Sequence, residues 1–272
     1  MPDEALTPAR LFNVEGLTAV VTGGASGIGI AYAEAMADNG AQVVLLDRDR
    51  DALDRAGAQL SARGARVDTQ AVDVTDHAAL DRALADTALR SGRLDVVFAN
   101  AGITAGPGFL TVDGKRDAAG AIENIPFDLW QRVIATNLSA VFATLRAAVP
   151  HMKRQNGGCL IATTSVAGLR PSAVVGTPYM IAKAACAHLV RQAALELARF
   201  GIRVNAIAPG PFLTPITSPG LRAIWERALP VRRVATTDEI QGLALFLASP
   251  ASAFVTGQQF LVDGGALLGR AD

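Results

Sequence analysis

Two residues of complementary chemistry, Tyr179 and Lys183, lie four positions apart in a segment with a strong helical pattern. Residues at this spacing share one helix face, so a phenol and an ammonium group can act at one place. A phenol serves as a base near neutral pH only when its pKa falls from ~10 toward ~7, worth roughly 4 kcal/mol. A lysine ammonium about 5 Å away supplies on the order of 3 kcal/mol at an effective dielectric of ~20. The pair predicts acid/base chemistry, although the same spacing is also common on solvated helix faces.

A glycine-rich stretch, Thr22–Gly29, joins the first β-rich run to the first helical pattern. A glycine loop in this position can bring backbone N–H groups against a pyrophosphate at a helix N-terminus. A tight turn that needs φ > 0 would explain one glycine pair, but three glycines at a strand-to-helix junction favour a dinucleotide.

Asp47 closes the second β-rich run, near the distance at which an acidic residue is expected to bind the adenosine ribose hydroxyls. A carboxylate there repels a 2′-phosphate, which favours NAD over NADP. Arg48 could instead pair with that phosphate if the carboxylate turned away, and Asp47 read alone is also an ordinary turn residue at a strand end.

Short β-rich runs alternate with longer helical patterns through most of the chain, which is typical of βαβ units. The predicted strands are Thr18–Thr22, Gln42–Leu46, Arg66–Val72, Leu94–Ala99, Cys159–Thr163, Ile202–Ala208 and Gln258–Val262. The predicted helices are Gly27–Asn39, Arg50–Ala62, Asp76–Arg90, Phe127–Gln155, Thr177–Phe200 and Thr237–Ala248. We therefore predict an α/β fold: a single-domain, Rossmann-type, doubly wound parallel sheet of seven strands with helices on both faces. This domain spans residues 14–272 after a flexible N-terminal tail, residues 1–13.

Two stretches break this rhythm, residues 103–126 and 212–234, and both follow the C-terminal ends of predicted strands. Ligands of open α/β sheets bind outside these ends, so we expect both stretches to shape a substrate site. The charges of the first stretch are expected to be solvated. Trp225 in the second fits either a cap over an apolar substrate or packing under a helix.

Composition argues against several other classes of function. The 25 basic and 25 acidic residues give a net charge of +0, without the basic patch that nucleic-acid binding needs. The chain begins without a signal-peptide pattern, and its apolar stretches are too short for a membrane span. Cys159 and Cys186 are expected to be reduced, and the scattered histidines, His77, His151 and His188, show no metal-ligand spacing. We expect a cytoplasmic protein without a metal.

Several further motifs stand in a fixed order along the chain. They are Thr22-Gly23-x-x-x-Gly27-x-Gly29, Asn100-Ala101-Gly102, Asn137, Ser165, Tyr179-x-x-x-Lys183 and Pro209-Gly210. Together they resemble the classical short-chain dehydrogenase/reductases, and the resemblance extends from about Gly16 to Gly265. The stretch between Gly102 and Asn137 is longer than the usual family pattern, and we expect it to border the pocket.

The resemblance implies a role for each matching residue. Ser165 would hydrogen-bond the reacting oxygen and Tyr179 would exchange its proton. Lys183 would assist the tyrosine and hold the nicotinamide ribose, and Asn137 would support a water-linked proton relay. The implied cofactor-binding residues are Gly23, Ser26, Gly27, Ile28, Gly29, Asp47, Asp73, Val74, Asn100, Ala101, Gly102, Tyr179, Lys183, Pro209, Phe212 and Thr214. The family's last strand, near Val262, often lies at a subunit interface, which implies a homotetramer.

The leading interpretation is an NAD-dependent oxidoreductase that transfers hydride between the cofactor and a small-molecule secondary alcohol or ketone. One alternative is an NADPH-dependent carbonyl reductase of the 3-oxoacyl type, which Asp47 opposes. Another is a dinucleotide-binding protein without catalysis, since fold alone does not establish function. The four candidate catalytic residues Asn137, Ser165, Tyr179 and Lys183 argue against the second alternative. The sequence does not identify the substrate.

Overall fold

The computed structural model describes residues 7–214 and 219–269. Of the predicted tail, residues 1–6 lie outside the described residues, and Pro8–Leu11 forms a short helix, α1. Part of the second irregular stretch, residues 215–218, also lies outside them.

One sheet of seven parallel strands organises the described chain. Its strands are β1 (Thr18–Thr22), β2 (Gln42–Asp47), β3 (Arg66–Ala71), β4 (Val96–Ala99), β5 (Gly158–Thr163), β6 (Ile202–Pro209) and β7 (Gln259–Val262). They lie in the order β3-β2-β1-β4-β5-β6-β7. The predicted α/β doubly wound fold is confirmed, and the largest difference at a strand end is at β4, which begins at Val96 rather than Leu94.

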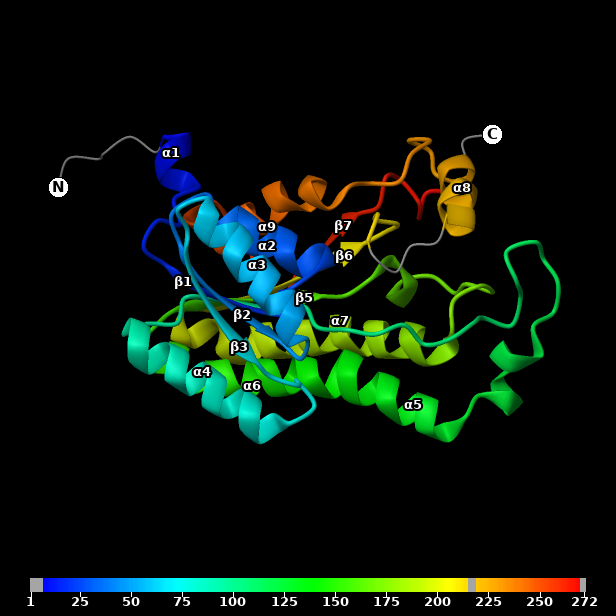
Figure 1. Cartoon of the computed structure of the whole chain (residues 1–272), viewed down its shortest axis with the longest axis horizontal. Coiled ribbons are helices and arrows are strands. Elements are labelled where there is room, and N and C mark those ends of the chain that lie inside the picture. The colour runs from blue at the N-terminus through cyan, green and yellow to red at the C-terminus, as the bar shows by residue number, and fades with distance from the viewer. Residues whose placement is uncertain (1–6, 215–218, 270–272) are drawn as a thin grey trace.

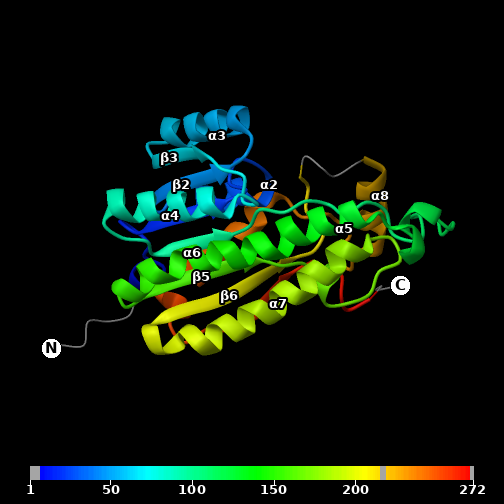
Figure 2. The same cartoon turned by 90° about the horizontal axis from the view of Figure 1, so that it is seen from below.

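Helices cover both faces of the sheet (Figures 1 and 2). One layer contains α2 (Gly27–Ala37), α3 (Arg50–Ala62) and α9 (Gln241–Ala248), and the other contains α4 (His77–Ser91), α5 (Phe127–Ile134), α6 (Ala140–Arg154) and α7 (Thr177–Leu197). A further helix, α8 (Pro219–Ala228), lies within the stretch that the sequence left irregular. Helices on both faces explain why the central strands are apolar throughout rather than alternating.

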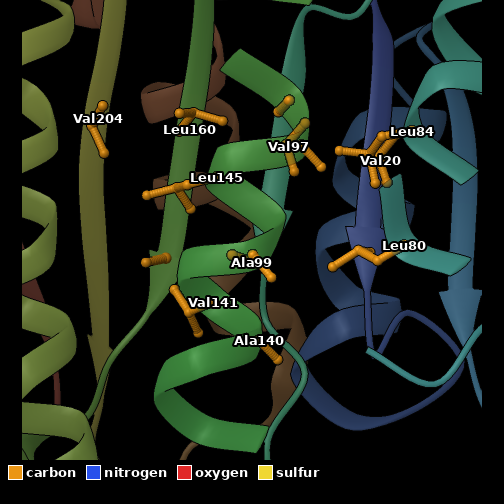
Figure 3. Close-up of a cluster of buried hydrophobic side chains, with 14 of the residues drawn as sticks. Val20, Leu80, Leu84, Val97, Ala99, Ala140, Val141, Leu145, Leu160 and Val204 are labelled. Carbon is orange, nitrogen blue, oxygen red and sulfur yellow. The ribbon is translucent and has the colours of Figure 1, made fainter. Parts of the chain in front are cut away.

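The core consists of two apolar clusters, one on each face of the sheet. Side chains of β1 divide between them: Val20 faces α4 and α6, whereas Ala19 and Val21 face α2 and α9. Figure 3 shows the first cluster, in which Leu80 and Leu84 of α4 and Val141 and Leu145 of α6 lie against the sheet. The alternation follows from the two-residue period of a strand.

The predicted long helix over residues 127–155 is interrupted. A π-helical segment, Ala135–Ser139, separates α5 from α6. Contrary to the expectation that every apolar stretch is too short for a membrane span, Phe127–Arg154 is long and apolar enough to cross a membrane, but half of its most apolar window is buried within the domain. Its packing against the sheet is that of a core helix.

Helix starts differ in how their backbone N–H groups are satisfied. Asp49 and Asp76 cap α3 and α4 by accepting from the amides of Ala52 and Ala79, each at 2.9 Å. Ser26 precedes α2 without a side-chain capping bond. Because capping usually satisfies these groups, the start of α2 keeps its N–H groups available to an anion.

Candidate active site

The chain reverses its direction of winding between β1 and β4, which are neighbours in the sheet although β2 and β3 lie between them in sequence. Crevices at such switch points are where open α/β sheets bind ligands. The glycine stretch follows β1, and Asn100-Ala101-Gly102 follows β4, so both predicted cofactor motifs meet at this crevice.

The glycine loop is packed too closely for side chains. A Cβ on Gly23 would lie 2.8 Å from the Cα of Ala101, and one on Gly29 would overlap the carbonyl oxygen of Gly23. Gly23 and Gly27 also have φ of 63° and 55°, a region that favours glycine. Here the backbone itself forms the surface, which is what close approach to a pyrophosphate requires.

A second segment faces the glycine loop from across the crevice. Gly210 donates its amide to the carbonyl of Val262 at 2.9 Å, which continues the sheet edge beyond Pro209. Phe212 is buried and pairs with Ala235. A Cβ on Gly27 would lie 3.6 Å from Cγ2 of Thr214. Thr214, one of the predicted nicotinamide-end residues, therefore lies beside Gly27 of the predicted phosphate loop, although the two are far apart in the sequence.

The Asp47 carboxylate is directed back toward the glycine loop. It accepts from the Ala25 amide at 3.3 Å and from the Asp49 amide at 3.2 Å. Asp73 stands after β3 next to the buried Val74. Hydrogen bonds from the Thr75 amide and hydroxyl lower the pKa of Asp73, and the Arg48 charge contributes. Asp47 and Asp73 therefore stand at the C-terminal ends of two neighbouring strands, β2 and β3.

Asn100 joins the ends of three strands. Its Nδ2 donates to the carbonyls of Thr22 and Gly23, each at 3.2 Å. Its Oδ1 accepts from the hydroxyl of Thr163 at 3.0 Å. The amides of Asn100 and Ala101 donate to the Thr22 hydroxyl. These bonds fix the crevice floor from within the protein.

At the chemical end, α7 presents Tyr179 and Lys183 on one face, as predicted. The Lys183 Nζ is buried, donates to the carbonyl of Thr163 at 2.6 Å, and lies 5.7 Å from the centre of the Tyr179 ring. A Cβ on Gly102 would lie 3.7 Å from the same Nζ. The predicted cofactor motif after β4 thus borders the lysine.

Ser165 stands on the turn that leads from β5 toward α7. Its Oγ accepts from the Ala167 amide at 3.1 Å, which leaves the hydroxyl proton for an outside acceptor. Gly168 packs on the backbone of α7, where a Cβ would lie 2.7 Å from the carbonyl carbon of Lys183. This contact holds the Ser165 turn against the helix that carries the tyrosine and the lysine.

Asn137 occupies the middle of the π-helical segment and is fully buried. Both ends of its side-chain amide bond to Ile103: Oδ1 accepts from the amide at 2.7 Å, and Nδ2 donates to the carbonyl at 2.8 Å. The backbone carbonyl of Asn137 accepts from the thiol of Cys186 at 3.0 Å. Its side chain therefore connects the stretch after β4 to the helix layer, and its carbonyl faces α7.

Sequence reasoning did not find Thr163, Ile103, Cys186 or Tyr32. Ile103 bonds to Asn137 through its backbone, and Thr163 holds Lys183 through its carbonyl, so no side-chain signal could mark these contacts. Tyr32 is wholly buried in α2, stacks on Phe98, and lies 3.4 Å from the Thr163 hydroxyl. A tyrosine in an otherwise apolar helix face is a weak signal that a polar partner exists inside the core.

No cluster of metal-ligating side chains occurs within residues 7–214 and 219–269. Cys159 and Cys186 are both free and buried. Burial raises the pKa of each thiol, so both groups stay protonated and donate to backbone carbonyls.

Residues 23–266 match the family model described as enoyl-(acyl carrier protein) reductase. Sorbose reductase from Schizosaccharomyces pombe is 34% identical over 264 residues, which cover 94% of this chain and 97% of that protein. A short-chain dehydrogenase/reductase structure from Mycobacterium marinum superposes with a TM-score of 0.86 at 33% identity, covering 94% of this chain and 97% of that one.

Two solved structures contain nicotinamide cofactors. A 7α-hydroxysteroid dehydrogenase complex with NADH has a TM-score of 0.85 at 29% identity and covers 96% of this chain and 98% of that chain. A gluconate 5-dehydrogenase from Burkholderia cenocepacia, in complex with NADP and tartrate, has the same TM-score and identity and covers 96% and 99%. Because the match extends over nearly the whole chain, this protein is an oxidoreductase acting on alcohols or ketones, and it belongs to the short-chain dehydrogenase/reductase family.

Proposed function

We propose that the chain is an NAD-dependent oxidoreductase that transfers hydride between the cofactor and a secondary alcohol or ketone, with Tyr179 as the acid/base. One observation carries the proposal: Lys183 is buried, anchored to Thr163, and shares a helix face with Tyr179. Burying an ammonium group costs free energy. A buried lysine beside a phenol therefore indicates that its charge acts on that phenol.

Tyr179, Ser165 and Lys183 each have a separate role at the reacting oxygen of the substrate. In alcohol oxidation Tyr179 accepts the hydroxyl proton at its phenolate oxygen, and in ketone reduction it returns that proton. Ser165 donates its hydroxyl proton to the same substrate oxygen, where negative charge develops. Lys183 favours the phenolate form by its charge. The nicotinamide, when bound, accepts or supplies the hydride.

Asn137 supports the passage of protons to and from the tyrosine through water. Its side chain is fixed by Ile103, so its backbone carbonyl has a defined position beside α7. A fixed carbonyl can orient a water molecule next to Lys183, and this ammonium can exchange a proton with Tyr179.

The crevice fits a dinucleotide because its glycines leave no room for side chains and α2 begins without a capping side chain. The pyrophosphate would lie on Gly23, Ser26, Gly27, Ile28 and Gly29. Asp47 would bind the adenosine ribose, and Asp73 and Val74 would border the adenine. The residues that would lie along the cofactor are Asn100, Ala101 and Gly102. Tyr179, Lys183, Pro209, Phe212 and Thr214 would surround the nicotinamide end.

NAD is preferred over NADP because the Asp47 carboxylate faces the glycine loop, where a 2′-phosphate would meet it. A second candidate is an NADPH-dependent carbonyl reductase. The exposed Arg48 favours it, since that charge acts on Asp73 and is therefore near the adenosine end. A non-catalytic dinucleotide-binding protein is the weakest candidate, because it would have no use for a buried lysine beside a tyrosine.

We further propose a homotetramer. Exposed apolar side chains occur in two parts of the described chain. The first part is the helix layer of α6 and α7, with Phe142, Ile181 and Leu195, where Phe142 also lines a hollow of about 500 Å³. Phe254 and Leu261 form the other, at the β7 edge of the sheet. Two distinct self-complementary surfaces build a dimer of dimers. Light scattering of Phe142→Ser and of Phe254→Ser should each give a smaller assembly, and a monomeric parent protein would contradict this.

A cytoplasmic location suits this assignment, because both thiols are reduced and buried and neither closes a disulfide. Fractionation of cells that express the full chain should recover it with cytoplasmic markers, and recovery with membranes or secreted protein would contradict the location.

The first experiment is an absorbance assay of reduced nicotinamide with NAD or NADP against a panel of secondary alcohols, repeated with Tyr179→Phe. We expect activity with NAD that the variant loses by roughly 10²–10⁴-fold, the range of general acid–base catalysis. NAD binding by the variant should be unchanged. A variant that retains turnover contradicts the role of Tyr179, and NAD binding without turnover of any alcohol or ketone supports the non-catalytic candidate.

A further inference from the structure

The long stretch after β4, residues 103–126, crosses the end of the molecule beside the start of α7; we call it the strap (Figures 1 and 2). It is joined to the loop of residues 166–176, which connects Ser165 to α7. Pro107 forms an antiparallel bridge with Val175, and the Leu110 amide donates to the Ala173 carbonyl at 2.9 Å. The strap is therefore attached to the segment that carries the reacting residues.

Three glycines make this attachment close. A Cβ on Gly176 would overlap the Ala105 carbonyl, and one on Gly108 would overlap the Ala173 carbonyl. A Cβ on Gly120 would in turn overlap the Gly108 carbonyl. None of the three has a positive φ, so glycine is needed here for space rather than for conformation. Backbone layers stacked this closely leave little freedom for the strap to move as a unit.

The strap's own polar groups hold it together. Its tip turns at Thr111, whose hydroxyl bonds to Asp113 and whose amide donates to the Lys115 carbonyl at 2.8 Å. Asp117 accepts from the Ala119 amide at 3.0 Å, and Asn124 donates to the Ala118 carbonyl at 2.9 Å. Groups committed to these internal bonds are not available to a ligand.

Apolar side chains remain exposed on the strap and on the loop joined to it. The exposed fractions are 40% for Phe109, 52% for Val112, 48% for Leu169 and 41% for Val174. The strap also continues to the site itself, because Ile103 and Ala105 share an apolar cluster with Tyr179. The strap and the loop joined to it thus carry exposed apolar side chains on a fixed backbone, and the strap begins in the apolar cluster that contains Tyr179.

We infer that the strap is a preformed apolar wall of the substrate site, which selects alcohols and ketones with an apolar ring or chain next to the carbinol carbon over polyhydroxylated ones. The inference rests on the proposed function and adds the substrate class to it. The hydroxyls of a polyol against this wall would lose their hydration without gaining hydrogen-bond partners. An apolar ring or chain would instead release water from its own surface and from the wall.

The test compares kcat/KM for cyclohexanol and for sorbitol with the cofactor saturating. We expect the parent protein to prefer cyclohexanol at least tenfold. Phe109→Ser should reduce that preference by about tenfold, in the range that a few methylene groups contribute to selectivity, without changing the KM for NAD. Phe109 is partly exposed, so this variant should fold. A preference for sorbitol, or an unchanged ratio in Phe109→Ser, overturns the inference.

Rigidity is tested with Gly108→Ala, which must displace the Ala173 carbonyl, and with Gly242→Ala as a matched control that meets no neighbour within 4 Å. Gly108→Ala should raise the KM for cyclohexanol at least tenfold, and Gly242→Ala should leave it unchanged. Equal KM values in the two variants overturn the inference.

Hydrogen exchange provides a readout that does not depend on turnover. The amides of Leu110 and Asp117, bonded to the carbonyls of Ala173 and Phe109, should be protected in the parent protein. Rapid exchange would mean a mobile lid and overturn the inference. Loss of the proposed function would look different: no alcohol or ketone would react, whereas the exchange result would still decide whether the wall is fixed.

Discussion

Lys183 donates from Nζ to the backbone carbonyl of Thr163 across 2.6 Å, which ties the N-terminal part of α7 to the end of β5. The Thr163 hydroxyl meanwhile donates to Asn100, whose amide holds the carbonyl of Gly23. One residue therefore links the lysine to the glycine loop. The chemical and cofactor ends of the site share a rigid support, so a change at Lys183 should affect both.

Replacing the lysine with an apolar residue of similar length tests this link. Lys183→Met should lower kcat by at least 10²-fold and shift the pH dependence of kcat/KM to higher pH, because no ammonium then favours the phenolate. It should also raise the KM for NAD. Steady-state assays between about pH 6 and 10 measure all three effects, given the ordinary tyrosine range.

Lys153→Met is the control, because Lys153 lies near the end of α6 and its ammonium contacts only the Phe200 ring among the interactions of the described residues. It should keep kcat and the pH profile of the parent protein. An unshifted profile in Lys183→Met, with kcat lowered, would mean that the lysine acts only as a structural anchor.

The chain has two tyrosines, and removing the hydroxyl of each should have opposite effects. Tyr179→Phe should lose turnover while keeping its thermal stability. Tyr32→Phe should keep turnover but lower the free energy of unfolding by about 1 kcal/mol, since the Thr163 hydroxyl 3.4 Å away would lose one of its two side-chain partners and keep only Asn100. For a domain of this size, that is about 2–4 °C in Tm. Scanning calorimetry and the nicotinamide assay measure the pair, and a loss of turnover in both variants would contradict the separate roles.

Local signals in the sequence were sufficient to predict the sheet, the shared helix face of Tyr179 and Lys183, and the position of the glycine loop. The spacing of Tyr179 and Lys183 placed them on one face of α7 because a helix repeats every 3.6 residues. The glycine loop could be placed at the crevice because Gly27 opens a helix directly after a strand. Both predictions depend on short stretches in which the residue types indicate the local backbone conformation.

The remaining features depend on contacts between distant backbones. The π-helical turn at Asn137 has no side-chain signature, since it arises from a hydrogen-bond shift that Ile103 and Cys186 stabilise from other elements. The close packing of the glycines at 108, 120 and 176 was not predicted, because only the stacked carbonyls show that these positions need glycine for space. The helix Pro219–Ala228 was also missed, within a stretch that appeared irregular from its prolines and glycine.

Glu239 should make stability depend on pH. Hydrogen bonds from Arg233 and from the Thr236 amide lower the pKa of Glu239 from 4.5 to about 2. A carboxylate whose pKa is lower in the folded state than in the unfolded state stabilises the fold at pH values above its unfolded pKa. This contribution to stability is lost as the pH falls through its folded pKa. The difference in Tm between the parent protein and Glu239→Gln should therefore be largest above about pH 5 and shrink between 4.5 and about 2.

The magnitude should be small, because Arg233 and Glu239 are substantially solvent-exposed, and solvent screens exposed ion pairs. Glu226→Gln, which breaks an exposed pair within α8, is the control and should show a weaker dependence. A Tm difference that grows as the pH falls would contradict the direction of the shift.

Cofactor choice should be decided by a single carboxylate. Asp47→Ser removes the charge that a 2′-phosphate would meet, while its neighbour Arg48 stays in place to attract that phosphate. The ratio of kcat/KM for NADP to that for NAD should rise at least tenfold, about 1.4 kcal/mol. Asp49→Ser is the matched control, because serine preserves the cap on α3 and leaves the Asp47 carboxylate facing the Ala25 amide. If both variants gave the parent ratio, the Asp47 carboxylate would not be what excludes the phosphate; if both raised it equally, a general loss of negative charge beside the crevice would explain the change.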